Sequence, residues 1–181
     1  MTKTNVLIVE DENIVAKDIQ HSLKKLGYNV VGIASSGEKA ITLASEHKPD
    51  VVLMDIMLQG EMSGIEAAKE IHGNLKIPVI YLTAYADENT LNKAKITEPY
   101  GYIIKPFKEI DIHTSIEMAL YKHGKITEIT KERDFLYSIV DKQSTPDLIF
   151  VKSNSRLVKL KTKDIYFVEA LKDYVTINTL E

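Results

Sequence analysis

The sequence has no cysteine and no apolar run long enough to span a membrane. Without cysteine, a disulfide framework and thiolate metal sites are excluded. Near the N-terminus only residues 6–9 are consecutively apolar, which is too few for the hydrophobic region of a secretory signal. We therefore expect a cytoplasmic protein that does not associate with a membrane.

Length and charge indicate more than one segment. The 181 residues suggest one or two domains, and 44% hydrophobic with 27% charged residues is typical of a globular chain. Residues 1–124 hold 13 basic and 17 acidic residues, whereas residues 125–181 hold 10 and 9. The change predicts a first domain at 1–124, a linker helix at 125–145 and a further segment at 146–181.

Two periodicities alternate along the first 124 residues. Short apolar runs typical of strands buried on both faces occupy residues 5–9, 30–34, 51–55, 78–83 and 100–104. Segments with helical spacing follow them at residues 13–27, 36–47, 64–75, 87–97 and 108–123. The alternation predicts an α/β fold with a doubly wound parallel sheet. In the first helix we expect an inward stripe of Ile14, Ile19, Leu23 and Leu26.

Polar residues follow the strands at the edge where parallel sheets bind ligands. The first strand is followed by Glu10 and Asp11, the third ends in Asp55, the fourth in Thr83, and Lys105 follows the fifth. Clustered carboxylates repel one another unless a cation intervenes, and their oxygens suit Mg²⁺. Each residue also has an ordinary alternative as a helix cap, a strand residue or a solvated charge. The five histidines are scattered, and we assign them no ligand role.

In order and spacing, these residues resemble the receiver domain of two-component response regulators. The resemblance covers residues 4 to about 122 and rests on Glu10-Asp11, Asp55, Thr83-Ala84, Tyr102 and Lys105-Pro106. It implies a flavodoxin-like (βα)5 fold and Mg²⁺-dependent transfer of a phosphoryl group from a sensor histidine kinase. It also implies a phosphoacceptor whose own chemistry is limited to self-phosphorylation and dephosphorylation, and not an enzyme.

The resemblance assigns roles by position. It makes Asp55 the phosphoacceptor and gives Mg²⁺ the carboxylates of Asp11 and Asp55 and the main-chain carbonyl of Met57. Glu10 then orients a metal-bound water.

The remaining roles concern the phosphoryl group and the switch. By resemblance, Thr83 and Lys105 bind phosphoryl oxygens, and Thr83 and Tyr102 change with the phosphorylation state. The family also implies a cis peptide bond between Lys105 and Pro106.

Two positions depart from the common pattern. Met57 stands where relatives often have a polar residue, and Tyr85 lies two residues beyond Thr83. Because no polar side chain at Met57 assists an attacking water, we expect slow self-hydrolysis of the phosphorylated form.

A helix with one apolar stripe is predicted from Ile112 to Val140, weakened but not broken at Gly124. Two interpretations remain open. The helix packs on its own domain, or it pairs with its copy in a homodimer.

Residues 146–181 predict strands and resemble the start of a LytTR-type DNA-binding domain, about a third of its length. This partial all-β segment carries a run of five basic residues that could touch phosphates: Lys152, Arg156, Lys159, Lys161 and Lys163. The ordinary alternative is a charged face of alternating strands. We expect DNA binding in a full-length protein, and no specific binding by this fragment.

Three rival functions fit the sequence less well. A phosphatase with an aspartate nucleophile needs a second Asp where Met57 stands. A nucleotide-binding domain needs glycines where residues 10–13 read Glu-Asp-Glu-Asn. A receiver-like module used only for assembly has no need of an intact acidic pocket.

Overall fold

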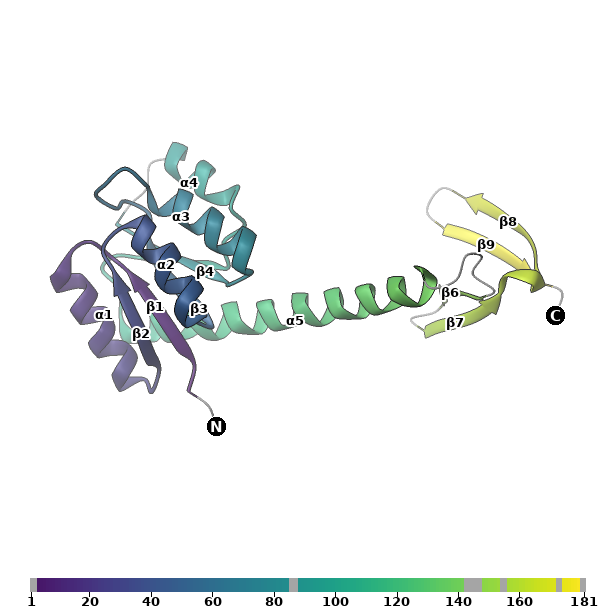
Figure 1. The fold of residues 1–181 in the computed structure, drawn as a ribbon, viewed down its shortest axis with the longest axis horizontal. Coiled ribbons are helices and arrows are strands. Elements are labelled where there is room, and N and C mark those ends of the chain that lie inside the picture. The colour runs from purple at the N-terminus through teal and green to yellow at the C-terminus, as the bar shows by residue number, and fades with distance from the viewer. Residues whose placement is uncertain (1–2, 85–87, 142–147, 154–155, 172–173, 180–181) are drawn as a thin grey trace. The chain divides into compact units, whose positions relative to one another are not determined.

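The computed structural model describes residues 3–84, 88–141, 148–153, 156–171 and 174–179. The chain divides into two compact units, residues 1–126 and 127–181. In the first unit, strands and helices alternate as the sequence predicts (Figure 1).

The elements of the first unit are short and close to their predicted bounds. The strands are β1 (Asn5–Val9), β2 (Asn29–Ala34), β3 (Val51–Asp55), β4 (Val79–Thr83) and β5 (Gly101–Ile104). The helices are α1 (Asn13–Lys25), α2 (Gly37–His47), α3 (Gly64–Glu70), α4 (Glu88–Lys95) and the first part of α5 (Glu109–Asp141).

The five strands form one parallel sheet in the order β2-β1-β3-β4-β5. Strands β3 and β4 are buried at every residue, whereas the edge strands β2 and β5 are partly exposed. The chain reverses its winding direction at β1, next to β3. This is the predicted doubly wound, flavodoxin-like sheet, and its switch point lies between β1 and β3.

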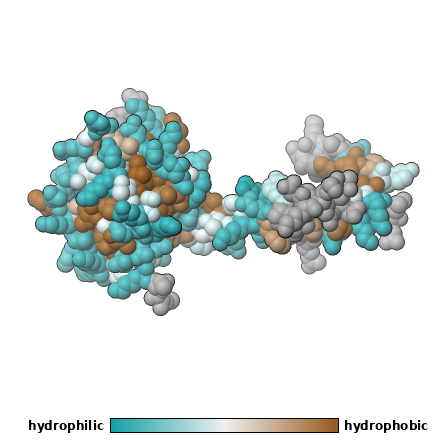
Figure 2. All heavy atoms as spheres, in the orientation of Figure 1, coloured by the Kyte–Doolittle hydropathy of each residue, from teal (hydrophilic) through white to brown (hydrophobic). Residues whose placement is uncertain are grey.

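Helices cover both faces of the sheet. On one face, α2, α3 and α4 pack small residues such as Ala40, Ala67 and Ala94 against the sheet. On the other face, α1 and the first turns of α5 pack Ile19 and Ile112 against it. Hydrophilic residues take up much of the surface visible in Figure 2. The core thus forms two apolar layers on either side of the strands, which fixes the strand ends in place.

The predicted inward stripe of α1 is wrong at one residue. Ile14 is 78% exposed, whereas Ile19 and Leu23 are fully buried and Leu26 packs against them. Five residues turn an α-helix by about 140° beyond a full turn, so Ile14 and Ile19 cannot share a face. Ala16 occupies the inward position instead.

The helix predicted at residues 64–75 is two elements. Ser63 caps α3 through a reciprocal pair of bonds with Glu66, and a π-helical turn, η1 (Ile71–Leu75), follows α3. Ile71 is fully buried in this turn.

Helix α5 continues without interruption through Gly124 to Asp141, as the apolar spacing predicts. A single exposed glycine lowers helix stability by about 1 kcal/mol, which a helix of this length tolerates. None of the helices in the described ranges combines the length and apolar character needed to cross a bilayer.

The second unit contains antiparallel strands, as predicted for a partial all-β segment. Strands β6 (Leu148–Ser153) and β7 (Arg156–Lys161) form one two-stranded sheet. After the short 3-10 turn η2 (Thr162–Asp164), β8 (Ile165–Leu171) and β9 (Tyr174–Thr179) form another.

Candidate functional site

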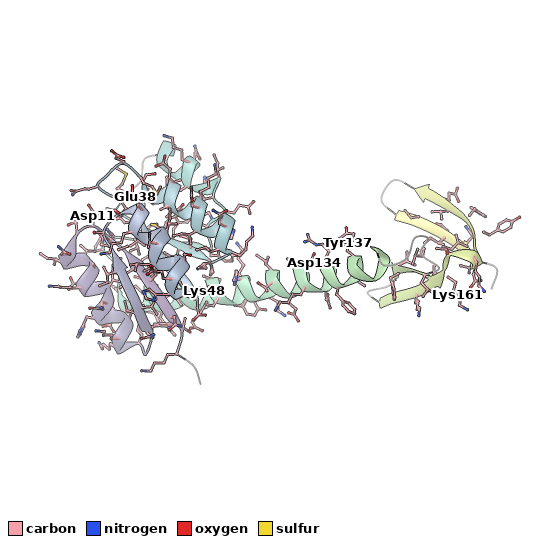
Figure 3. All side chains as sticks on the ribbon, viewed as in Figure 1. Asp11, Glu38, Lys48, Asp134, Tyr137 and Lys161 are labelled. Carbon is pink, nitrogen blue, oxygen red and sulfur yellow. The ribbon has the colours of Figure 1, made fainter. Side chains whose placement is uncertain are left out.

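Three carboxylates meet at the carboxyl edge of the sheet. Glu10 and Asp11 follow β1, and Asp55 ends the neighbouring strand β3. One oxygen from each of these three side chains lies within 4.8 Å of the others. Asp11 is labelled at this edge in Figure 3. The predicted gathering of acids from separate strands is therefore present.

Lys105 reaches the same carboxylates from the end of β5. Its Nζ donates to Glu10 Oε2 at 2.6 Å and to Asp55 Oδ2 at 2.5 Å. The side chain is 16% exposed, and its backbone N–H donates to the Thr83 carbonyl at 2.7 Å. The bond from Lys105 to Pro106 is cis, as expected. One ammonium thus joins two carboxylates in a largely buried pocket.

The side chains of the pocket carry more negative than positive charge. Burial raises the pKa of Glu10, the hydrogen bond from Lys105 opposes that rise, and the negative charge of Asp55 adds to it. Burial works against the charge of Lys105, but its hydrogen bonds to Asp55 and Glu10 outweigh burial and raise its pKa. A single cation therefore compensates three acids incompletely, which favours a further cation at this place.

The donor set fits a hard divalent cation. Glu10, Asp11 and Asp55 offer oxygen ligands, and ions such as Mg²⁺ bind through one or two carboxylates while keeping several waters. The N–H of Met57 donates to Asp55 Oδ1 at 2.9 Å, which fixes the carboxylate plane. The Met57 side chain itself is 73% exposed at the rim.

Thr83 and Tyr102 lie near this edge, on the neighbouring strands β4 and β5. Thr83 is buried at the end of β4, where its Cα pairs with that of Ile104. Tyr102 packs its ring 5.7 Å from the ring of Tyr81, and its hydroxyl is buried without a hydrogen-bond partner among the described residues. Their roles in phosphate binding and switching stay predictions.

The basic run lies in the second unit. Lys159 and Lys161 stand on β7 and Lys163 on η2, and all three are exposed. The side chains of Lys152 and Arg156 fall outside the described residues. The prediction that this run touches phosphates is not tested.

Gly64 is a site residue that the sequence analysis missed. It begins α3, and its N–H donates to the Ile56 carbonyl at 3.2 Å. A Cβ at Gly64 would overlap the backbone carbonyl of Asp55 and lie 3.2 Å from the Ile56 Cα. Only a residue without a side chain lets α3 begin this close to the phosphoacceptor candidate. Its position beside the capping residue Ser63 was the available signal.

Substituting Gly64 with alanine is expected to destabilise the fold and to displace Asp55. Because the obstructing atoms belong to the backbone, the free energy of unfolding should fall by about 1–3 kcal/mol or more. Urea unfolding followed by circular dichroism measures this change.

Gly124→Ala is the matched control for this substitution. A Cβ at Gly124 meets no atom within 4 Å, and the residue lies inside α5, so alanine should stabilise by about 0.5–1 kcal/mol. Equal effects of the two substitutions would contradict the close approach at Gly64.

Comparison with known proteins gives one family. The model of the response regulator receiver domain matches residues 6–117. The transcriptional regulatory protein PdtaR of Mycobacterium tuberculosis is 36% identical over 127 residues, which are 70% of this chain and 62% of PdtaR. The phyllosphere-induced regulator PhyR of Methylorubrum extorquens is 35% identical over 65% of this chain and 44% of PhyR. The chain thus spans less than two thirds of these relatives.

Solved structures agree with the sequence relatives. The receiver domain of a modulated diguanylate cyclase from Desulfovibrio desulfuricans G20 matches with a TM-score of 0.66 and 38% identity, covering 68% of this chain and 98% of that one. The receiver domain of the sensor histidine kinase PA1611 from Pseudomonas aeruginosa matches with a TM-score of 0.60 and 28% identity, covering 66% and 98%. That structure holds a magnesium ion in its active-site cleft.

Proposed function

Since the chain belongs to the response regulator receiver domain family, we propose that Asp55 accepts a phosphoryl group from the phosphohistidine of a sensor histidine kinase. The observation that carries this proposal is the convergence of Asp55, Glu10 and Lys105 within hydrogen-bond distance at one sheet edge. A carboxylate beside a single ammonium and further acids is suited to phosphoryl transfer, and ordinary helix capping does not need that arrangement.

In the proposed reaction, a carboxylate oxygen of Asp55 forms the new O–P bond as the P–N bond to histidine breaks. The electron pair of that bond remains on the imidazole nitrogen, which takes up a proton. Lys105 moves from the Asp55 oxygen to an oxygen of the transferred group, where negative charge now lies. The Thr83 hydroxyl contacts another phosphoryl oxygen, and the Met57 N–H holds the carboxylate in plane.

Asp11, Asp55 and the Met57 carbonyl are the residues that would hold Mg²⁺, with Glu10 acting through a water. When bound, Mg²⁺ supplies positive charge that neutralises the phosphoryl oxygens. The oxygen donors within 4.8 Å and the magnesium-bound relative support this assignment.

The phosphoryl group on Asp55 adds negative charge to the pocket, and this charge drives a conformational switch. Contacts between the phosphoryl group and Thr83 favour one of two conformations, and Tyr102 changes position with it. The Tyr102 hydroxyl is buried and has no hydrogen-bond partner among the residues that the structure describes, which supports this role, because an unsatisfied buried group gains by reaching a partner or water.

Met57 prolongs the lifetime of the phosphorylated state. Replacing Met57 with asparagine places a polar side chain at the pocket rim, where it can orient an attacking water. We expect the phosphoryl group of Met57→Asn to be lost several-fold faster than that of wild type. Loss of the phosphorylated species in a time course of intact mass measures the rate. Unchanged decay would contradict the role of this position.

The output in a longer protein is DNA binding through a LytTR-type domain, and the phosphorylated regulator acts as a homodimer. The antiparallel pairs β6–β7 and β8–β9 and the exposed Lys159, Lys161 and Lys163 support a nucleic-acid surface. DNA affinity of this chain should be weak, independent of base sequence and steeply dependent on salt.

Incubation with Mg²⁺ and a small phosphodonor tests the proposed function. Intact mass spectrometry should show a gain of one phosphoryl group that requires Mg²⁺ and disappears with a chelator. Sustained hydrolysis of many phosphomonoesters would favour a phosphatase instead. No gain with any donor or kinase would favour an assembly module.

A further inference from the structure

Helix α5 changes its environment along its length. Its first turns pack Ile112, Ile116 and Ala119 into the core, where all three are fully buried. From residue 120 to residue 137 no side chain of the helix is buried. The exposed part nevertheless carries large apolar residues, which include Ile126 at 45% and Ile129 at 64% exposure. Helices in proteins are stabilised mainly by packing of an apolar face, because an isolated helix is only marginally stable in water. The exposed apolar side chains of this part of α5 are therefore available for such packing.

Three apolar residues of this part and one arginine follow a heptad. Ile126, Ile129, Arg133 and Leu136 are spaced by 3, 4 and 3 residues, and the sequence places Val140 at the next position. At 100° per residue the first four fall within an arc of about 80°. Alternating spacings of 3 and 4 are the pattern of a two-stranded coiled-coil seam. These four residues are called the α5 seam.

We propose that the α5 seam pairs, in parallel and in register, with the α5 seam of a second copy of this chain. Ile126 and Arg133 then occupy a positions, and Ile129 and Leu136 occupy d positions. The proposal names the surface of the homodimer proposed above and rests on that dimer. The seam contains no residue of the phosphoryl site, so its pairing can be tested without phosphoryl transfer.

Charge favours a second copy as the occupant. The side chain of Arg133 is 60% exposed and donates to Asp134 Oδ1 of the same helix at 2.9 Å (Figure 3 labels Asp134 on α5). In the parallel pair Glu132 takes a g position, beside the a position of the facing helix. Arg133 of each copy therefore meets Glu132 of the partner subunit. A purely apolar partner groove would offer this guanidinium no acidic residue across the interface.

The α5 seam is short, so we expect the dimer that it forms to be weak. About two heptads bury less than the roughly 1,000 Å² expected of a stable interface, so the contact alone is weak. A charged residue at one a position further lowers stability while it specifies register. Replacing Arg133 with leucine should therefore strengthen self-association several-fold, and Ile129→Glu should abolish the part that the seam contributes. Sedimentation equilibrium measures both.

Cysteine cross-linking tests the proposal in the full chain, because the protein has no cysteine of its own. In a parallel, in-register pair, like d positions come within disulfide distance. Ile129→Cys should form a disulfide dimer under mild oxidation. Lys131→Cys is the matched control, since Lys131 is exposed at the outward f position, and it should cross-link several-fold more slowly.

Other outcomes overturn the proposal. Equal cross-linking at both positions, or preferential cross-linking of a mixture of Ile126→Cys and Leu136→Cys, contradicts the parallel seam. A dimer by light scattering without an Ile129→Cys cross-link shows that another surface is used. The Ile129→Cys cross-linking is repeated in a protein that also carries Asp55→Asn and cannot be phosphorylated there. A cross-link in this double variant supports the seam whether or not the proposed phosphoryl transfer is correct.

Discussion

Asp55→Asn is expected to lose all incorporation of a phosphoryl group from small phosphodonors and from a sensor kinase. The amide keeps the size of the carboxylate and can still accept the bond from the Met57 N–H. It lacks the anionic oxygen that attacks phosphorus, and no neighbouring carboxylate can replace it without moving. Glu10 lies beneath Lys105 and is nearly inaccessible, at 1% exposure. Intact mass after incubation with Mg²⁺ and donor measures the effect.

The control for this variant is Asp18→Asn. Asp18 is exposed on α1, so the substitution makes the same change of charge away from the pocket. It should incorporate the phosphoryl group as wild type does. Residual incorporation in Asp55→Asn, mapped by peptide analysis to another residue, would show that Asp55 is not the acceptor.

Lys105→Met is expected to weaken the fold at neutral pH in the absence of divalent metal. The substitution removes the ammonium that bonds both Glu10 and Asp55 and leaves these buried carboxylates without that cationic partner. Removing one partner of a buried ion pair costs about 3–5 kcal/mol. Urea unfolding of the variant beside wild type, in the presence of a chelator, measures the loss.

The lost stability should return in two ways. Mg²⁺ binds the folded state and supplies the missing positive charge, so its stabilising effect should be larger in the variant than in wild type. Acid should also restore stability. Glu10 has a folded-state pKa above its unfolded value, so its contribution is present below the unfolded pKa and is lost as pH rises through the folded pKa. Without Lys105 this dependence becomes steeper.

Lys108→Met is the matched control, because Lys108 is exposed three residues away. It should change stability little and show no added response to Mg²⁺. A Lys105→Met variant as stable as wild type at pH 7 without metal would mean that the pocket tolerates its negative charges. The electrostatic account of the site would then be wrong.

The sequence predicted the convergence of these side chains because strands that run parallel in one sheet end at the same edge. Once the runs ending at Asp55 and before Glu10 and Lys105 are recognised as buried parallel strands, their ends share one edge. No measured distance was needed for that inference. The bond from Lys105 to Glu10 was not foreseen, since spacing alone does not say which carboxylate a flexible side chain chooses.

Other features depend on geometry that a linear pattern does not carry. Ile14 was misplaced because a spacing of five residues rotates a helical residue off its face. Gly64 was missed because its importance lies in a close approach to the Asp55 carbonyl, which the sequence pattern between the two residues does not show. The π turn after Glu70 was missed for a similar reason, since its apolar pattern is shared with an ordinary α-helix.

A crystal structure with Mg²⁺ and beryllofluoride, a mimic of the phosphoryl group, tests the central claim most directly. The account predicts beryllofluoride joined to the Asp55 carboxylate, with Lys105 and Thr83 on its fluorine atoms. It also predicts Mg²⁺ at about 2.0–2.1 Å from oxygens of Asp11, Asp55 and the Met57 carbonyl. Binding of both species away from Asp55, or a Lys105 that remains on Glu10 alone, would contradict it.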